Sequence, residues 1–220
     1  ADEFNGSGPV ITTASPLPSA STGVAYSTGL AATTLDNQWD VVGGALPPGL
    51  NLTQGISNAQ VAGTPTATGA FRFRVRVTHV GSGAIAEKDF DIAVANPLPT
   101  LTQLTPSSVV AGSPGLTLTV QGTGFVNGTV VRWNGNTRPT TVVGPATMTV
   151  AIPASDLVSA GAVSVTVVNP PPGGGTSNLL TFTVSVPPPS AFGKTAPANG
   201  AVGRPETTTI SWAVSAGAAS

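Results

Sequence analysis

Asp89 and Asp91 are the two carboxylates whose close spacing best suits acid–base chemistry. Catalysis by such a pair needs a site that separates their pKa values, so that one is protonated while the other is ionised. Both lie in the alternating segment 87–94, so they share one face of an expected strand. The segment 71–77 likewise places three arginines on one face. The pattern therefore favours an exposed ladder of ion pairs over a catalytic pair.

The two segments are expected to form a hairpin, because Gly81-Ser82-Gly83 between them is typical of a tight turn. The preferred register pairs Arg72 with Asp91, Arg74 with Asp89, and Arg76 with Glu87. A slip of two residues would keep the charges matched, whereas a slip of one would bury them. Lys88 then falls on the core-facing side, and is expected near the end of the sheet with its ammonium group reaching outward. The acids neutralise the arginines, so this face predicts no nucleic-acid site.

Metal and nucleophile candidates are sparse elsewhere. Asp36 and Asp40 are weak candidates for calcium ligands, but their spacing does not follow the EF-hand template, and a polar turn before a strand is the simpler interpretation. His79, at the end of a strand, is expected at the surface rather than as a catalytic base. Trp39, Trp133 and Trp212 have rings that could stack on sugars, although Trp39 and Trp133 occupy expected core positions. We expect no catalytic residues, no metal site and no cofactor.

The composition excludes several classes of protein. The 220 residues include no cysteine and one histidine, which excludes disulfides, thiolate catalysis and multi-histidine metal sites. Eight basic and nine acidic residues give a net charge of −1, so no basic field exists for nucleic acid or an anionic membrane. No run approaches the roughly 20 apolar residues that span a bilayer. The charged fraction of 8% and the absence of targeting motifs favour an extracellular or cell-surface location.

Short alternating segments separated by Gly, Pro and Asn predict an all-β protein made of tandem β-sandwiches in an elongated arrangement. The expected inward rows of the second half are Leu116, Leu118, Val120; Val131, Trp133; Met148, Val150, Ile152; Val163, Val165, Val167; and Leu180, Phe182, Val184, Val186. Proline-rich segments predict the boundaries, because proline runs favour stiff, extended geometry. We expect an N-terminal extension, two sandwiches and a proline-rich linker with a partial further domain, at residues 1–8, 9–95, 97–186 and 187–220.

The first sandwich resembles the putative-immunoglobulin, cadherin-like repeats of bacterial surface proteins. The matching residues are Trp39, the run Leu46-Pro47-Pro48-Gly49-Leu50, Gly63-Thr64-Pro65 and the alternating strand at 71–77. Such repeats often carry an aspartate where this chain has His79.

The second sandwich resembles the IPT/TIG immunoglobulin-like family, through Gly122-Thr123-Gly124-Phe125, Val131-x-Trp133-Asn134-Gly135 and Ala151-Ile152-Pro153. The two resemblances together imply tandem immunoglobulin-like β-sandwiches in an elongated arrangement. Some members of that family bind DNA, but this copy lacks the basic loops that this requires. The resemblance to bacterial members implies a spacer in a surface protein or an accessory module of a secreted glycosidase. Residues 196–212 are similar to the opening of a fibronectin-type-III-like repeat, of which only the first two strands would be present.

These observations predict a non-enzymatic extracellular structural or adhesive protein, as a subunit or segment of a prokaryotic surface filament, sheath or stalk. A two-stranded piece is marginal alone in water, so Phe4, Trp212 and Val214 are candidates for contact with another copy by β-strand addition. The alternative is that a third sandwich continues beyond residue 220. Expected partners are other copies or neighbouring surface domains. A second hypothesis is a spacer or carbohydrate-binding accessory module of a secreted glycosidase, with glycans as partners.

Overall fold

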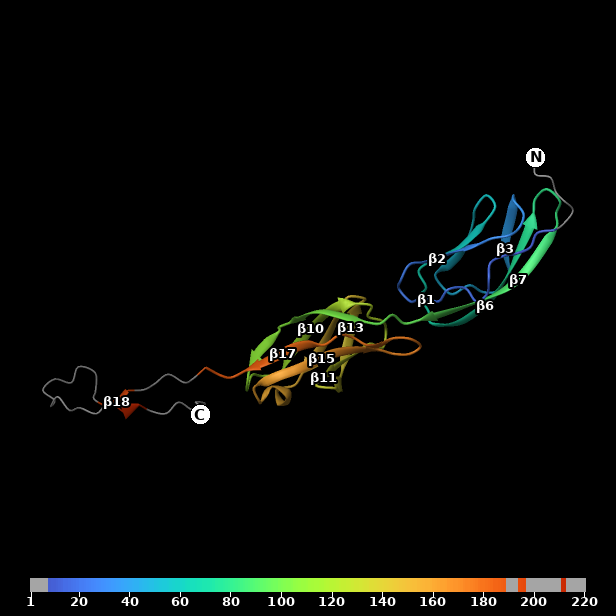
Figure 1. The fold of residues 1–220 in the computed structure, drawn as a ribbon. Coiled ribbons are helices and arrows are strands. Elements are labelled where there is room, and N and C mark those ends of the chain that lie inside the picture. Colours follow the sequence, from blue (N-terminus) through green and yellow to red (C-terminus); the bar gives the residue numbers. More distant parts are fainter. Residues whose placement is uncertain (1–7, 189–193, 197–210, 213–220) are drawn as a thin grey trace.

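The computed structural model describes residues 8–188, 194–196 and 211–212. Residues 8–188 form two β-sandwiches that lie end to end (Figure 1). The prediction of an all-β protein with tandem immunoglobulin-like sandwiches is confirmed. In the described ranges, no helix has the length and apolar character needed to cross a membrane.

The first sandwich packs a four-stranded sheet on a three-stranded one. The larger sheet has the order β1 (Ala20–Ser21), β7 (Ile85–Ala95), β6 (Gly69–His79) and β3 (Asn37–Gly44). The smaller sheet has the order β2 (Tyr26–Leu30), β5 (Ala59–Gly63) and β4 (Leu50–Gln54). Alternation along each strand sends apolar side chains into the shared core. The core includes Leu30, Trp39, Leu50, Phe73, Phe90 and Ile92.

The backbone of the first sandwich requires glycine at the end of the Leu-Pro-Pro-Gly run and at Gly63. Gly49 has a φ of +90° and Gly63 a φ of +140°, and their backbones lie against each other. A Cβ on Gly63 would lie 2.1 Å from the carbonyl oxygen of Gly49. Any side chain there would separate the start of β4 from the end of β5.

The second sandwich packs two larger sheets on each other. One has the order β13 (Thr140–Gly144), β14 (Thr147–Ile152), β10 (Leu116–Thr123) and β8 (Thr100–Thr105). The other has the order β12 (Asn136–Arg138), β11 (Val130–Trp133), β15 (Gly161–Asn169), β17 (Leu180–Ser185) and β9 (Ser108–Val110), with β16 (Gly175–Thr176) also pairing with β15. A short 3₁₀ helix, Ala154–Leu157, follows β14.

The predicted inward rows of the second sandwich are buried in its core, with Leu116 and Leu180 at the core's edge. Trp133 packs on Phe182 with ring centroids 5.0 Å apart. The prediction for Val186 is wrong, because this side chain is 66% exposed. Strand β17 ends at Ser185, and the prolines that follow cannot continue its ladder.

Both sandwiches close in the same way. In the first, the N-terminal segment bridges to the smaller sheet through Ile11 and Ala32, and then crosses to the larger sheet, where β1 runs parallel to β7. In the second, β8 pairs antiparallel with β10, and β9 then runs parallel to β17. The first and last parts of each domain are therefore hydrogen-bonded in parallel.

The C-terminal segment contributes a short antiparallel pair, β18 (Lys194–Ala196) with β19 (Ser211–Trp212). Trp212 lies in β19, opposite Lys194. The other two interaction candidates, Phe4 and Val214, lie outside the described residues. Contact of this end with another copy stays a prediction.

Candidate functional site

The exposed face of the β6–β7 hairpin carries the densest set of charges that the sequence singled out. We call Arg72, Arg74, Arg76, Glu87, Asp89 and Asp91 the charge ladder. The predicted register is confirmed, because Arg76 lies opposite Glu87, Arg74 opposite Asp89 and Arg72 opposite Asp91. The alternation of β6 and β7 places all six side chains on the outer face of the sheet.

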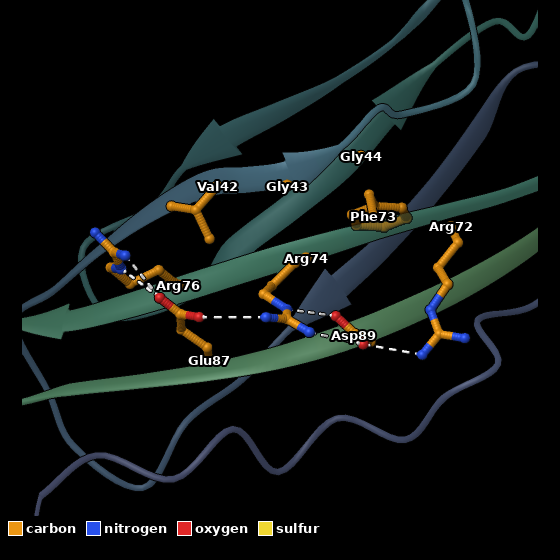
Figure 2. A pocket seen from close by; sticks show the side chains of 9 residues that line it. All are labelled: Val42, Gly43, Gly44, Arg72, Phe73, Arg74, Arg76, Glu87 and Asp89. Atoms are coloured by element: carbon orange, nitrogen blue, oxygen red, sulfur yellow. Dashed lines mark hydrogen bonds and ion pairs between the residues drawn. The ribbon is translucent and has the colours of Figure 1, made fainter.

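The ion pairs of the ladder converge on Asp89 (Figure 2). Arg74 Nε donates to Asp89 Oδ1 at 2.6 Å, and Arg72 Nη2 donates to Asp89 Oδ2 at 2.9 Å. The expected Arg72–Asp91 ion pair is therefore wrong, since this guanidinium reaches diagonally along the neighbouring strand. Glu87 accepts from Arg76 Nη2 at 2.7 Å.

The two arginines make Asp89 a stronger acid. Hydrogen bonds from Arg74, and then from Arg72, hold the pKa of this carboxyl well below its ordinary value of 3.8. A lowered folded-state pKa contributes stability that is present above the unfolded pKa and is lost as the pH falls through the folded pKa. The Asp89 carboxyl is thus expected to stay ionised in mild acid.

A carbon-13 NMR titration of the Asp89 carboxyl checks this expectation. The midpoint should lie clearly below 3.8, and Arg74→Gln should move it upward more than Arg72→Gln, because the Arg74 hydrogen bond is the larger cause. A midpoint at 3.8 in the unaltered chain, or no response to Arg74→Gln, would contradict the ion-pair geometry.

A shallow hollow of about 370 Å³ lies beside the ladder, between it and β3. Its β3 wall is Val42, Gly43 and Gly44, where a β-bulge shifts the register between Val41 and Gly43. Gly44 has a φ of +66°, and a Cβ there would lie 2.2 Å from the Arg72 carbonyl oxygen. The two glycines leave the flank of the arginines uncovered. Sequence reasoning missed this hollow, although the Val-Val-Gly-Gly run at the end of an expected strand was its signal.

Lys88 lies on the core-facing side of β7, as the alternation predicts, but opposite Val75 within the β6–β7 ladder and not at its end as expected. Its Nζ donates to the Thr13 carbonyl oxygen at 2.5 Å and lies 5.7 Å from the centre of the Phe90 ring. The aliphatic stem thus covers the rim of the core, and a backbone carbonyl holds the charge there.

The two calcium candidates do not come together in a ligand set. Asp36 and Asp40 are both exposed, and Asp40 lies opposite Arg76 in the β3–β6 register. Asp36 adopts a φ of 52° in the turn before β3, as a polar turn residue does. Within residues 8–188, no group of three or more His, Cys, Asp or Glu side chains is placed to hold a metal ion.

Millimolar calcium is therefore expected to leave the melting temperature of the chain unchanged in a thermal scan. A calcium-dependent rise of about 10 °C would contradict this, because such a shift needs a site that binds calcium tightly in the folded state. Magnesium at the same concentration is the control for ionic strength.

The expectation that His79 is a surface residue is wrong. Its side chain is only 8% exposed, and its Nδ1 lies 2.8 Å from the Ser82 hydroxyl oxygen. The ring folds under the hairpin turn, where it fixes the turn between β6 and β7. Trp39 and Trp133 are buried, at 2% and 3% exposure, so the core interpretation of both is confirmed. Neither ring is placed to stack on a sugar.

Two successive parts of the chain each match a known protein family. Residues 8–95 match the family described as Putative Ig domain, and residues 99–184 match the family described as IPT/TIG domain. No curated protein matches the chain in sequence.

Several solved structures are similar to this chain over about four-fifths of its length. A fragment of titin is 13% identical with a TM-score of 0.48, over 81% of this chain and 66% of that one. An endo-fucoidan hydrolase from glycoside hydrolase family 107 is 17% identical with a TM-score of 0.39, over 83% of this chain and 29% of that one. SGBP-B of a Bacteroides ovatus mixed-linkage glucan utilization locus, solved with a mixed-linkage heptasaccharide, is 19% identical with a TM-score of 0.31, over 81% and 48%. The chain thus spans less than a third of the hydrolase, and these likenesses concern the fold alone.

Proposed function

From the premise that this chain carries a Putative Ig domain followed by an IPT/TIG domain, we propose that it is a non-enzymatic, tension-bearing spacer in an extracellular structure. The chain would be a segment or subunit of a prokaryotic surface filament, sheath or stalk. The observation that carries the proposal is the closure of both domains by parallel pairing of their first and last parts: β1 with β7, and β9 with β17.

Parallel pairing decides how a domain responds to tension. When a chain is pulled by its two ends, parallel first and last strands are drawn in opposite directions along their length. The load is then shared by all the hydrogen bonds between them, which must break together. In an antiparallel hairpin pulled by its ends, the bonds break one after another. Parallel closure therefore gives a high barrier to forced unfolding.

The bonds that would share the load are well formed. In the first domain, the Leu17 N–H donates to the Asp91 carbonyl and the Thr22 N–H to the Ala95 carbonyl, both at 2.9 Å. In the second, the Thr183 N–H donates to the Ser107 carbonyl at 3.1 Å. The two domains follow one another end to end, so the same tension would pass through both sets of bonds (Figure 1).

Single-molecule pulling of the whole chain by its ends tests this function. We expect two unfolding events at high force, each lengthening the chain by about 25–30 nm, because an extended chain spans up to about 3.6 Å per residue. Extension of either domain at low force, without a distinct event, would contradict a tension-bearing role.

The second candidate function, a carbohydrate-binding accessory module, is favoured by the hollow beside the charge ladder. Arg74 and Glu87 line it, and their ion pairs hold donors and acceptors in fixed positions that suit sugar hydroxyls. If the chain is only a spacer, insoluble polysaccharides should not retain it in a pull-down experiment. Retention that is lost in Arg74→Ala but kept in Arg138→Ala, a charge-matched change in the other domain, would favour the accessory function instead.

A further inference from the structure

The connection between the two domains is short and is hydrogen-bonded to the second domain. Strand β7 ends at Ala95 and β8 begins at Thr100, so residues 96–99 form the whole connection. The loop at residues 170–175 of the second domain, which we call the joint loop, reaches back to the start of this connection. Asn96 and Gly173 form a parallel bridge across the two domains.

Asn96 forms hydrogen bonds to both domains. Its backbone N–H donates to the Pro172 carbonyl at 2.8 Å, and its carbonyl accepts from the Gly174 N–H at 2.8 Å. Its Nδ2 donates to the Pro170 carbonyl at 2.8 Å. Its Oδ1 accepts from the Thr22 hydroxyl of the first domain at 3.0 Å. One side chain thus links both domains while its backbone pairs with the joint loop.

The joint loop needs its glycines for this contact. Gly173, Gly174 and Gly175 have φ values of +70°, +67° and +114°. A Cβ on Gly173 would lie 2.7 Å from both the Ala95 Cβ and the Asn96 carbonyl oxygen. A side chain at this position would therefore push the two domains apart.

A second asparagine ties the connection to the second domain. Asn169 is 2% exposed, and its Nδ2 donates to the carbonyls of Pro97 and Gly124 at 2.8 and 2.7 Å. Its Oδ1 accepts from the Thr129 hydroxyl at 2.6 Å. The residue that follows Asn96 is thus fixed to the buried interior of the second domain.

Apolar packing does not fill the rest of the junction. A groove of about 520 Å³ lies between Pro65 of the first domain, Leu98 of the connection and Phe125 of the second domain. Leu98 remains 62% exposed beside it. The hydrogen bonds of Asn96 therefore tie the end of the first domain to the joint loop, and those of Asn169 tie the connection to the second domain.

We propose that the joint loop is a docking site for the end of β7, and that it locks the two domains into one rigid body. This inference goes beyond the proposed function, because a stiff pair of domains is stiff whether or not it carries tension. It assigns a role to the Pro-Pro-Pro-Gly-Gly-Gly run that composition alone describes only as a loop.

Pulsed electron–electron double resonance on the whole chain tests the proposal. The chain has no cysteine, so Thr53→Cys in β4 and Thr141→Cys in β13, both exposed, place one spin label on each domain. The distance distribution is expected to be narrow. Asn96→Ala and Asn96→Asp should each broaden it, the second because it keeps the Thr22 acceptor but removes the donor to Pro170.

The matched control is Asn127→Ala, an exposed asparagine in another loop of the second domain, which should leave the distribution narrow. Unchanged far-UV circular dichroism shows that the variants remain folded, and Thr22→Val provides a milder, nearly isosteric loss of one bond. A broad distribution in the unaltered chain, or equal widths for all variants, would overturn the proposal. A narrow distribution combined with low unfolding forces would contradict the tension-bearing function alone.

Discussion

Replacing Phe73 with alanine is expected to lower the free energy of unfolding of the first domain by about 3–5 kcal/mol. The ring is 1% exposed and stacks on Phe90 with centroids 5.9 Å apart. It lies in β6 at the centre of the first core, where neighbouring strands cannot collapse into the space that it leaves. The loss should appear as a lower urea midpoint for the unfolding of the first domain, while the second domain keeps its own midpoint.

The control for Phe73 is the next residue along the same strand. Arg74 points to the opposite face and is 51% exposed as a side chain, so Arg74→Gln removes ion pairs but opens no cavity. Its effect on the urea midpoint should be far smaller. Equal losses for Phe73→Ala and Arg74→Gln would show that the two faces of β6 are wrongly assigned.

Replacing Ala111 with proline is expected to lower the unfolding force of the second domain while the first domain keeps its own. The Ala111 N–H donates to the Ser185 carbonyl at 2.8 Å, at the end of the parallel β9–β17 pair. Proline has no N–H, so one of the bonds that share the load is removed. Pulling the chain by its ends should therefore show one high-force and one weakened event.

Val143→Pro is the matched control for Ala111→Pro. Val143 is 66% exposed and lies in β13 at an irregular point of its pairing with β14, away from the first and last strands of the domain. It should leave both unfolding forces unchanged. If Val143→Pro weakens the second domain as much as Ala111→Pro does, the load does not pass through β9 and β17.

The sequence was sufficient to predict the fold class, the hairpin and its register. Strict alternation of Phe73, Val75 and Val77 with the arginines excludes registers shifted by one residue, which would bury charges, and the turn length favoured the observed register over one shifted by two. The buried tryptophans followed from the same alternation. The identity of each ion pair did not, because sheet twist brings a long arginine side chain close to diagonal neighbours, so that Arg72 reaches Asp89 rather than Asp91.

Contacts between distant segments account for what sequence reasoning missed. The side chain of Asn96 bonds to residue 170, 74 positions along the chain, and no local pattern predicts such a pair. The hollow depends on a bulge in β3, whose position is set by pairing with β6. His79 is buried because the hairpin turn folds over its ring. Its burial depends on the backbone conformation of the turn, which the residue type does not indicate.

Single-molecule pulling of the same two strands in two different directions tests the central claim most directly. Pulling the chain by its ends loads β9 and β17 in shear. Handles at Pro114→Cys and Val186→Cys, both exposed and both beyond the same end of this parallel pair, would instead peel the strands apart one hydrogen bond at a time. We expect the second domain to resist the first direction with a clearly higher force than the second. Equal forces in the two directions would contradict the claim that parallel closure makes this protein a tension-bearing spacer.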